Sequence, residues 1–185
     1  MITVSGLTSD PMTPTPPLRR GPPWQPATER TETMRTIEHA VDIQAPAATV
    51  WQVLTDTDRY PDWNPFMPRL SGRLTPGERL TITVRPGTRT MTFRPTVLAV
   101  EDGTLIRWRG RLGMPGLFDG EHELRLEPTA GGGTRFVQRE SFTGLLVPMM
   151  PRVLDDTATG FATMNTALRD RAVSRTAPAV RPAVP

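Results

Sequence analysis

The chain has 185 residues, of which 37% are hydrophobic and 22% are charged, and this fits one globular domain with additional segments. It contains no cysteine, which excludes disulfide bridges, thiol nucleophiles and cysteine-ligated metal sites. The pI is about 10.7, but the formal net charge is only +3 and every basic residue is an arginine. So small an excess of positive charge forms no concentrated basic surface, which argues against nucleic-acid binding.

Two kinds of segment are missing from the sequence. No apolar run reaches the length of about 18 residues that a membrane span needs. The first thirty or so residues also lack the short apolar core of a secretory signal. We therefore expect a cytoplasmic protein without a membrane span.

Proline-rich composition marks the two ends of the chain. Residues 1–33 include the stretch DPMTPTPPLRRGPPWQP, which cannot bury enough apolar surface to offset its conformational entropy. We expect residues 1–33 to be a disordered tail, with a proline-rich docking segment as the alternative, and Met34 is a candidate start. Residues 174–185 are expected to be a second disordered tail. One domain remains, over residues 34–173.

The domain begins with a strand and two short helices. Residues 36–44 alternate between apolar and polar side chains, as a half-buried strand does. Pro46 opens a helix at a position where its missing N–H costs nothing, and Pro61 forces a break. A second short helix is expected over residues 58–63.

Six further strands and one long helix complete the domain. Turn motifs such as Pro86-Gly87 and Asp102-Gly103 separate short alternating runs. The predicted strands are 68–74, 79–85, 90–101, 104–112, 117–127 and 134–143. Apolar residues from Leu146 to Leu168 then recur at intervals of three and four, which predicts one amphipathic helix with Pro148 and Pro151 in its first turns.

This order of elements predicts an α+β fold. A seven-stranded antiparallel sheet needs a cover on its apolar face, and the C-terminal helix is the predicted element that is long enough. We therefore expect a curved sheet wrapped around that helix, with the two short helices at one end. An internal cavity between the sheet and the helix is the expected result.

Three stretches of the sequence resemble a known family: APAATVWQVLTDTDRYPDWNPF, GLFDGEHELRLEP and GGGTRFVQRESFTGLLVPMM. They are similar to bacterial polyketide cyclase/dehydrase-like proteins of the START-related, helix-grip (SRPBCC) superfamily. The resemblance spans about residues 36–171. It implies a START-like ligand-binding domain whose hydrophobic cavity serves polyketide cyclisation or dehydration in some members, and carrying or sequestering of lipophilic molecules in others.

Strand alternation identifies the side chains that face this cavity. Phe118, Leu124 and Leu126 are apolar and even-numbered, so His122 is expected to point inward with them. The same argument turns Gln138 and Glu140 inward. If residue 126 pairs with residue 136, His122 lies opposite Glu140, and a tight preceding connection places Trp108 beside His122. The alternation predicts a row Trp108–His122–Glu140 across three strands.

The row is the candidate site for chemistry. A buried imidazole beside a carboxylate can donate and accept a proton near neutral pH, so His122 and Glu140 are the candidate catalytic residues. The structural alternative is that the two side chains satisfy each other's hydrogen bonds. The candidate ligand-binding residues are Trp63, Phe66, Phe93, Trp108, Phe118, His122, Leu124, Gln138, Glu140, Phe142, Met150, Leu154, Phe161 and Met164.

The function expected from the sequence is binding of a hydrophobic small molecule, aromatic or polyketide-like, in the internal cavity. Natural-product biosynthesis is the expected setting. One alternative is an enzyme of the polyketide aromatase/cyclase or dehydrase type, and another is sequestration of a reactive natural product as self-resistance. The two histidines lie on different predicted strands without further ligands at suitable spacing, so we expect no metal and no cofactor. An exposed edge strand would allow a homodimer as well as a monomer.

Overall fold

The computed structural model describes residues 34–176, and its elements follow the expected order. The strands are β1 (Arg35–Ile43), β2 (Arg69–Ser71), β3 (Thr81–Val84), β4 (Met91–Phe93), β5 (Thr96–Glu101), β6 (Leu105–Arg111), β7 (Asp119–Pro128) and β8 (Thr134–Thr143). The helices are α1 (Ala47–Thr55), the 3-10 turn η1 (Thr57–Arg59), α2 (Tyr60–Trp63), the 3-10 turn η2 (Val147–Met149) and α3 (Pro151–Thr176).

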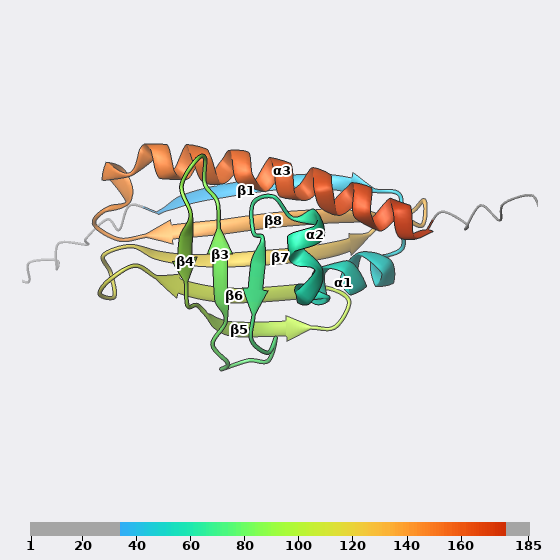
Figure 1. The fold of residues 1–185 in the computed structure, drawn as a ribbon, viewed down its shortest axis with the longest axis horizontal. Coiled ribbons are helices and arrows are strands. Elements are labelled where there is room, and N and C mark those ends of the chain that lie inside the picture. The colour runs from blue at the N-terminus through green and yellow to red at the C-terminus, as the bar shows by residue number, and fades with distance from the viewer. Residues whose placement is uncertain (1–33, 177–185) are drawn as a thin grey trace, which may run out of the picture. The chain divides into compact units, whose positions relative to one another are not determined.

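Two antiparallel sheets and one long helix form the architecture. The larger sheet has the order β1-β8-β7-β6-β5, and α3 packs on it along β1 (Figure 1). The smaller sheet has the order β2-β3-β4, and its strands run across those of the larger sheet in the same view. The predicted α+β architecture, with antiparallel strands, a long C-terminal helix on the sheet and short helices after the first strand, is confirmed.

The strands differ from the prediction at residues 90–101. This segment forms β4 and β5, which belong to different sheets, so the described chain has eight strands in two sheets instead of seven in one. The break falls at Pro95, which has no N–H to donate and disfavours helical geometry in the residue before it. The carbonyl oxygen of Pro95 accepts the N–H of Leu80 at 2.9 Å, which ties the break to the segment before β3.

The predicted register of the central strands is confirmed. Leu126 pairs with Phe136, and His122 therefore lies opposite Glu140. Trp108 pairs with His122 across β6 and β7. These pairs place the row Trp108–His122–Glu140 on the inward face of the larger sheet, because cross-strand partners share a face.

The C-terminal helix begins later than the prediction placed it. Residues 146–150 form a separate turn around η2, and α3 starts at Pro151. Two prolines cause the separation, since Pro148 and Pro151 have no N–H groups for a continuous helical ladder. At its other end α3 continues to Thr176, three residues beyond the expected domain end at 173. Of the predicted tails, 1–33 and 174–185, residues 174–176 are helical in α3, and residues 1–33 and 177–185 lie outside the described residues.

Tyr60 anchors the short helices to the core and gives the fold a testable response to pH. It is the single tyrosine of the chain, and its buried hydroxyl donates a 2.8 Å hydrogen bond to the carbonyl oxygen of Leu54. Burial raises the pKa of Tyr60 above the ordinary value of 10.0. The contribution of Tyr60 to stability is therefore complete below about pH 10 and is lost as the pH rises toward the folded-state pKa, by up to about 1.4 kcal/mol per pH unit.

We expect urea denaturation to show this decline above about pH 10, with Tyr60 as its main source, because the chain has no lysine or cysteine that titrates nearby. Absorbance of the tyrosinate ion should appear together with unfolding. Ionisation of Tyr60 near its ordinary pKa in the folded protein would contradict the buried placement. The variant Tyr60→Phe serves as the control, because it removes the ionisable group and should remove the pH dependence.

Candidate functional site

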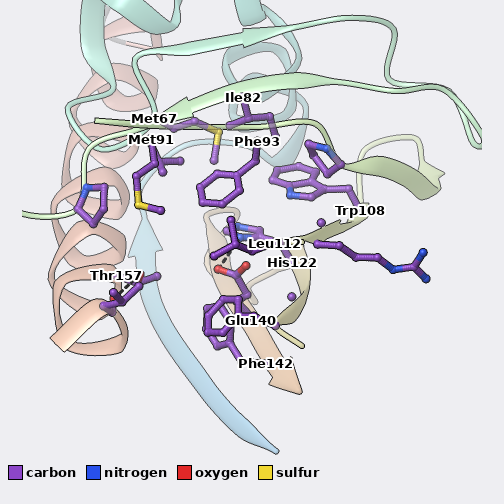
Figure 2. A pocket seen from close by; sticks show the side chains of 18 of the residues that line it. Met67, Ile82, Met91, Phe93, Trp108, Leu112, His122, Glu140, Phe142 and Thr157 are labelled. Carbon is purple, nitrogen blue, oxygen red and sulfur yellow. Dashed lines mark hydrogen bonds and ion pairs between the residues drawn. The ribbon is translucent and has the colours of Figure 1, made fainter. Parts of the chain in front are cut away.

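A cavity opens between the two sheets at the end of the domain where α3 begins. Its wall comes from both sheets and from the first turns of α3 (Figure 2). The space, counted with the open solvent at its mouth, is about 730 Å³. The lining residues are Phe66, Met67, Ile82, Val84, Pro86, Met91, Phe93, Pro95, Trp108, Gly110, Arg111, Leu112, Phe118, Gly120, His122, Glu140, Phe142, Val153 and Thr157.

Two glycines on neighbouring strands help to form the hollow. Gly110 of β6 pairs with Gly120 of β7, and both line the cavity. A Cβ atom at Gly110 would meet only the Cβ of Pro95, at 3.7 Å, whereas one at Gly120 would lie 2.8 Å from the Oε1 atom of Glu140. We call this pair the glycine floor. Glycine inside a strand marks a place where another group can approach the backbone closely.

Farther along α3, side chains fill the space between this helix and the larger sheet. Phe161, Met164 and Leu168 of α3 are each fully buried and belong to one core cluster with residues of α1 and of the larger sheet. Thr157 and Val153, about one and two turns before Phe161 in α3, line the cavity instead. The hollow is therefore confined to the part of the domain beside the start of α3.

The structure divides the fourteen candidate ligand-binding residues into two groups. Seven line the cavity, and these are Phe66, Phe93, Trp108, Phe118, His122, Glu140 and Phe142. The other seven do not line the cavity and instead lie in the hydrophobic core or pack against it. These are Trp63, Leu124, Gln138, Met150, Leu154, Phe161 and Met164.

Sequence reasoning missed much of the wall opposite the glycine floor. Ile82 and Val84 of β3 and Met91 of β4 line the cavity, yet none was a candidate. Strand alternation could have found the first two, because Leu80, Ile82 and Val84 are apolar at every second position. The alternation does not reveal that the smaller sheet folds over the larger one.

His122 is held between aromatic rings. It is 4% exposed, and its ring stacks on Trp108 with centroids 4.7 Å apart and an angle of 12° between the planes. The ring of Phe161 meets it edge-on at 5.1 Å. These contacts fix the imidazole plane, since aromatic packing restricts rotation of the ring in a dense core.

Both imidazole nitrogens of His122 have hydrogen-bond partners. Nδ1 lies 3.3 Å from the Oε2 atom of Glu140, and because a carboxylate only accepts, Nδ1 donates. Nε2 lies 3.2 Å from the Nε2 atom of Gln138, which donates to it in the neutral imidazole. The polar row of the inward face is therefore Gln138–His122–Glu140, and it fixes one tautomer of His122.

Glu140 is the member of this row that presents a free polar atom to the cavity. Its Oε2 atom is bonded to His122, while Oε1 has no hydrogen-bond partner among the described residues. The side chain is 19% exposed and lines the cavity, and Figure 2 shows its carboxylate between Phe93 and Phe142 in that view. The arrangement can thus offer an enclosed molecule a hydrogen-bond acceptor oriented by His122.

Among residues 34–176, no cluster of three or more histidine, aspartate or glutamate side chains could hold a metal ion. No helix in the same range is long and apolar enough to cross a membrane.

Comparison with known families agrees with this geometry. A family model described as polyketide cyclase / dehydrase and lipid transport matches residues 34–178. The chain belongs to this family. The resemblance identified from the sequence is thereby confirmed, and membership in the polyketide cyclase/dehydrase and lipid-transport family implies that hydrophobic molecules are bound. Among curated proteins, no sequence matches this family member.

Solved structures share the fold of this polyketide cyclase/dehydrase family member. The Zhui aromatase/cyclase from Streptomyces sp. R1128 has a TM-score of 0.67 and 20% identity, covering 80% of this chain and 99% of that one. A START superfamily protein from Mycobacterium smegmatis has a TM-score of 0.59 and 21% identity, covering 76% and 99%. Norcoclaurine synthase from Thalictrum flavum, in complex with dopamine and hydroxybenzaldehyde, has a TM-score of 0.60 and 14% identity, covering 80% and 91%. Identities this low indicate a common fold and leave activity open.

Proposed function

We propose that this protein binds one hydrophobic small molecule, aromatic or polyketide-like, in the cavity between its two sheets. The observation that carries the proposal is an apolar hollow with aromatic side chains on its wall and one oriented acceptor, the Oε1 atom of Glu140. Binding sites for small molecules commonly combine apolar walls with a few fixed polar groups. Norcoclaurine synthase, which has the same fold, was crystallised with two aromatic molecules, and this supports an aromatic ligand.

The candidate residues would contribute in two ways. The cavity-lining group would touch the ligand, with Phe66, Phe93, Phe118 and Phe142 supplying apolar contact area. The core group would hold these side chains in place without touching the ligand. Gln138 belongs to the second group, because it is fully buried and bonded to His122.

A leucine at the glycine floor tests whether the ligand occupies this cavity. Gly110→Leu is expected to weaken binding of 2-methoxynaphthalene by about tenfold or more, because the new side chain fills the space that a ring would occupy. The backbone should tolerate the change, since a Cβ at Gly110 meets no atom closer than 3.7 Å. Isothermal titration calorimetry measures the dissociation constants.

The matched control is Gly131→Leu, in the turn between β7 and β8. A Cβ there meets nothing within 4 Å, so the same substitution should leave the affinity unchanged. Unaltered affinity in Gly110→Leu would place the binding site elsewhere. If 2-methoxynaphthalene and related aromatic probes all failed to bind the unmodified protein, the proposed function would be rejected.

Enzymatic cyclisation or dehydration of a polyketide chain is the second candidate function. The observation that favours it is the free carboxylate oxygen of Glu140 in an apolar hollow, where a general base could remove a proton from carbon next to a carbonyl group. The geometry supports Glu140 as the catalytic base and His122 as its positioning residue. Product formation from polyketide intermediates would distinguish the enzyme from a binder. Self-resistance by sequestration would use the same cavity and would instead protect a sensitive host.

A further inference from the structure

We infer that the cavity selects planar ring molecules that carry a hydroxyl group, with the ring on the glycine floor and the hydroxyl donating to the Oε1 atom of Glu140. This inference rests on the proposed function and names the ligand class that the same cavity would prefer. It depends on three features of the described residues: the bare floor, the direction of the free carboxylate oxygen and the occupied nitrogens of His122.

The glycine floor favours a flat ligand. Gly110 and Gly120 pair with each other. The stacked rings of Trp108 and His122 form the neighbouring pair on the same face of these two strands. Ile82 and Phe93 line the cavity from the smaller sheet. A planar ring can approach the peptide backbone closely at Gly110, where an added Cβ would meet only the Cβ of Pro95, at 3.7 Å. A puckered ring of the same carbon count makes fewer contacts at van der Waals distance with such a surface.

The position of Glu140 sets where the hydroxyl would lie. Its Oε1 atom is 2.8 Å from the position that a Cβ of Gly120 would occupy, so this oxygen lies over Gly120, beside the open backbone of Gly110. The ring of Phe142 is 3.5 Å from the same position. A ring over Gly110 would therefore lie beside Phe142 and bring a substituent within hydrogen-bonding reach of the carboxylate.

Two other polar side chains of the wall, those of His122 and Thr157, already have hydrogen-bond partners. His122 uses both nitrogens, and the hydroxyl of Thr157 donates to the carbonyl oxygen of Val153 at 2.7 Å. Arg111 is exposed, and its Nε atom lies 3.7 Å from Asp119. The Oε1 atom of Glu140 is thus the side-chain oxygen of the described wall that has no partner of its own.

An ionised carboxylate discriminates between ligands by hydrogen-bonding type. It can accept from a hydroxyl group, but it repels the lone pairs of an ether or ketone oxygen. A polar group left without a partner in an apolar site loses binding free energy.

Three probes of similar size test separately whether the ligand must be planar and whether it must carry a hydroxyl group. 2-Naphthol is planar and carries a hydroxyl, 2-methoxynaphthalene is planar without a donor, and trans-2-decalol carries the hydroxyl on a puckered frame. We expect 2-naphthol to bind the unmodified protein about tenfold more tightly than either of the others, as measured by titration calorimetry. This comparison needs no variant and therefore does not depend on the folding of a mutant.

Two variants assign the preferences to residues. In Glu140→Gln the amide oxygen accepts from His122 and the amide NH₂ faces the cavity, so the preference for 2-naphthol over 2-methoxynaphthalene should disappear or reverse. Gly110→Ala adds a methyl group to the floor without touching Glu140 and should weaken 2-naphthol binding about tenfold, while the preference for planar over puckered probes falls. Gly131→Ala is the matched control, because the turn is open there.

The possible outcomes separate this inference from the proposed function. Equal affinity of the three probes for the unmodified protein would overturn the inference and leave cavity binding intact. A persistent preference for 2-naphthol in Glu140→Gln would also overturn it. Failure of all these probes to bind would reject the proposed function, and the inference with it.

Discussion

Gly160→Ala lowers the free energy of unfolding by about 2 kcal/mol, although alanine is the better helix former. Gly160 lies in α3, and the ring of Phe66 packs directly on its backbone, with Cδ2 only 2.1 Å from the position of an added Cβ. Phe66 is itself 3% exposed and meets Phe161 edge-on at 5.8 Å, so its ring has little room to move. The steric cost of about 3 kcal/mol therefore exceeds the gain in helix propensity of about 1 kcal/mol.

Chemical denaturation measures this effect, and a double-mutant cycle with Phe66→Ala assigns it. Without the ring, the added methyl group meets no obstacle, so the double variant should be about 3 kcal/mol more stable than the sum of the single effects. Thr159→Ala, at the adjacent exposed position, is the control and should change stability by less than about 0.5 kcal/mol. Additivity of the two substitutions would show that Phe66 does not lie on Gly160.

His122→Ala destabilises the protein by about 4 kcal/mol, because packing and hydrogen bonding are lost together. The substitution leaves a cavity between Trp108 and Phe161, which both contact the imidazole ring. It also removes the partner of Gln138, whose side chain is fully buried. Denaturant titration at neutral pH measures the loss, with unchanged far-ultraviolet circular dichroism as evidence that the variant folds.

His122→Phe separates the two contributions. An aromatic ring of similar shape keeps the contacts with Trp108 and Phe161, so only the unpaired polar groups should cost stability, by about 1 to 2 kcal/mol. The fold is expected to remain intact and ligand affinity to change, because Glu140 loses the N–H that orients it. Equal losses in both variants would mean that the rings contribute nothing, contrary to the stacked geometry.

The row Trp108–His122–Glu140 shows what strand alternation can and cannot predict. The pairing of His122 with Glu140 and with Trp108 followed from two turn positions and the parity of apolar residues, and the structure has both pairs. Parity works here because a shift of one residue would turn the whole apolar face of a strand toward solvent. The same rule does not say which nitrogen of His122 meets which neighbour.

The wall of the cavity was harder to predict. Phe161 and Met164 have the spacing of a helix face that covers a sheet, yet they fill the core, whereas Val153 and Thr157 reach the hollow. Periodicity identifies the buried face of a helix but not whether the space opposite is filled. That depends on which side chains of other elements arrive there, and on the absence of side chains at Gly110 and Gly120.

The sequence by itself determined the order of the elements, the antiparallel register of β6, β7 and β8 and the family, because these depend on local periodicity, turn residues and recognisable motifs. The tertiary structure decided that Pro95 divides the strands between two sheets, that the hollow occupies one end of the domain and that Glu140 rather than His122 presents a free atom to it. These features depend on packing and hydrogen bonding between side chains that are distant in the sequence. No local sequence pattern specifies such contacts.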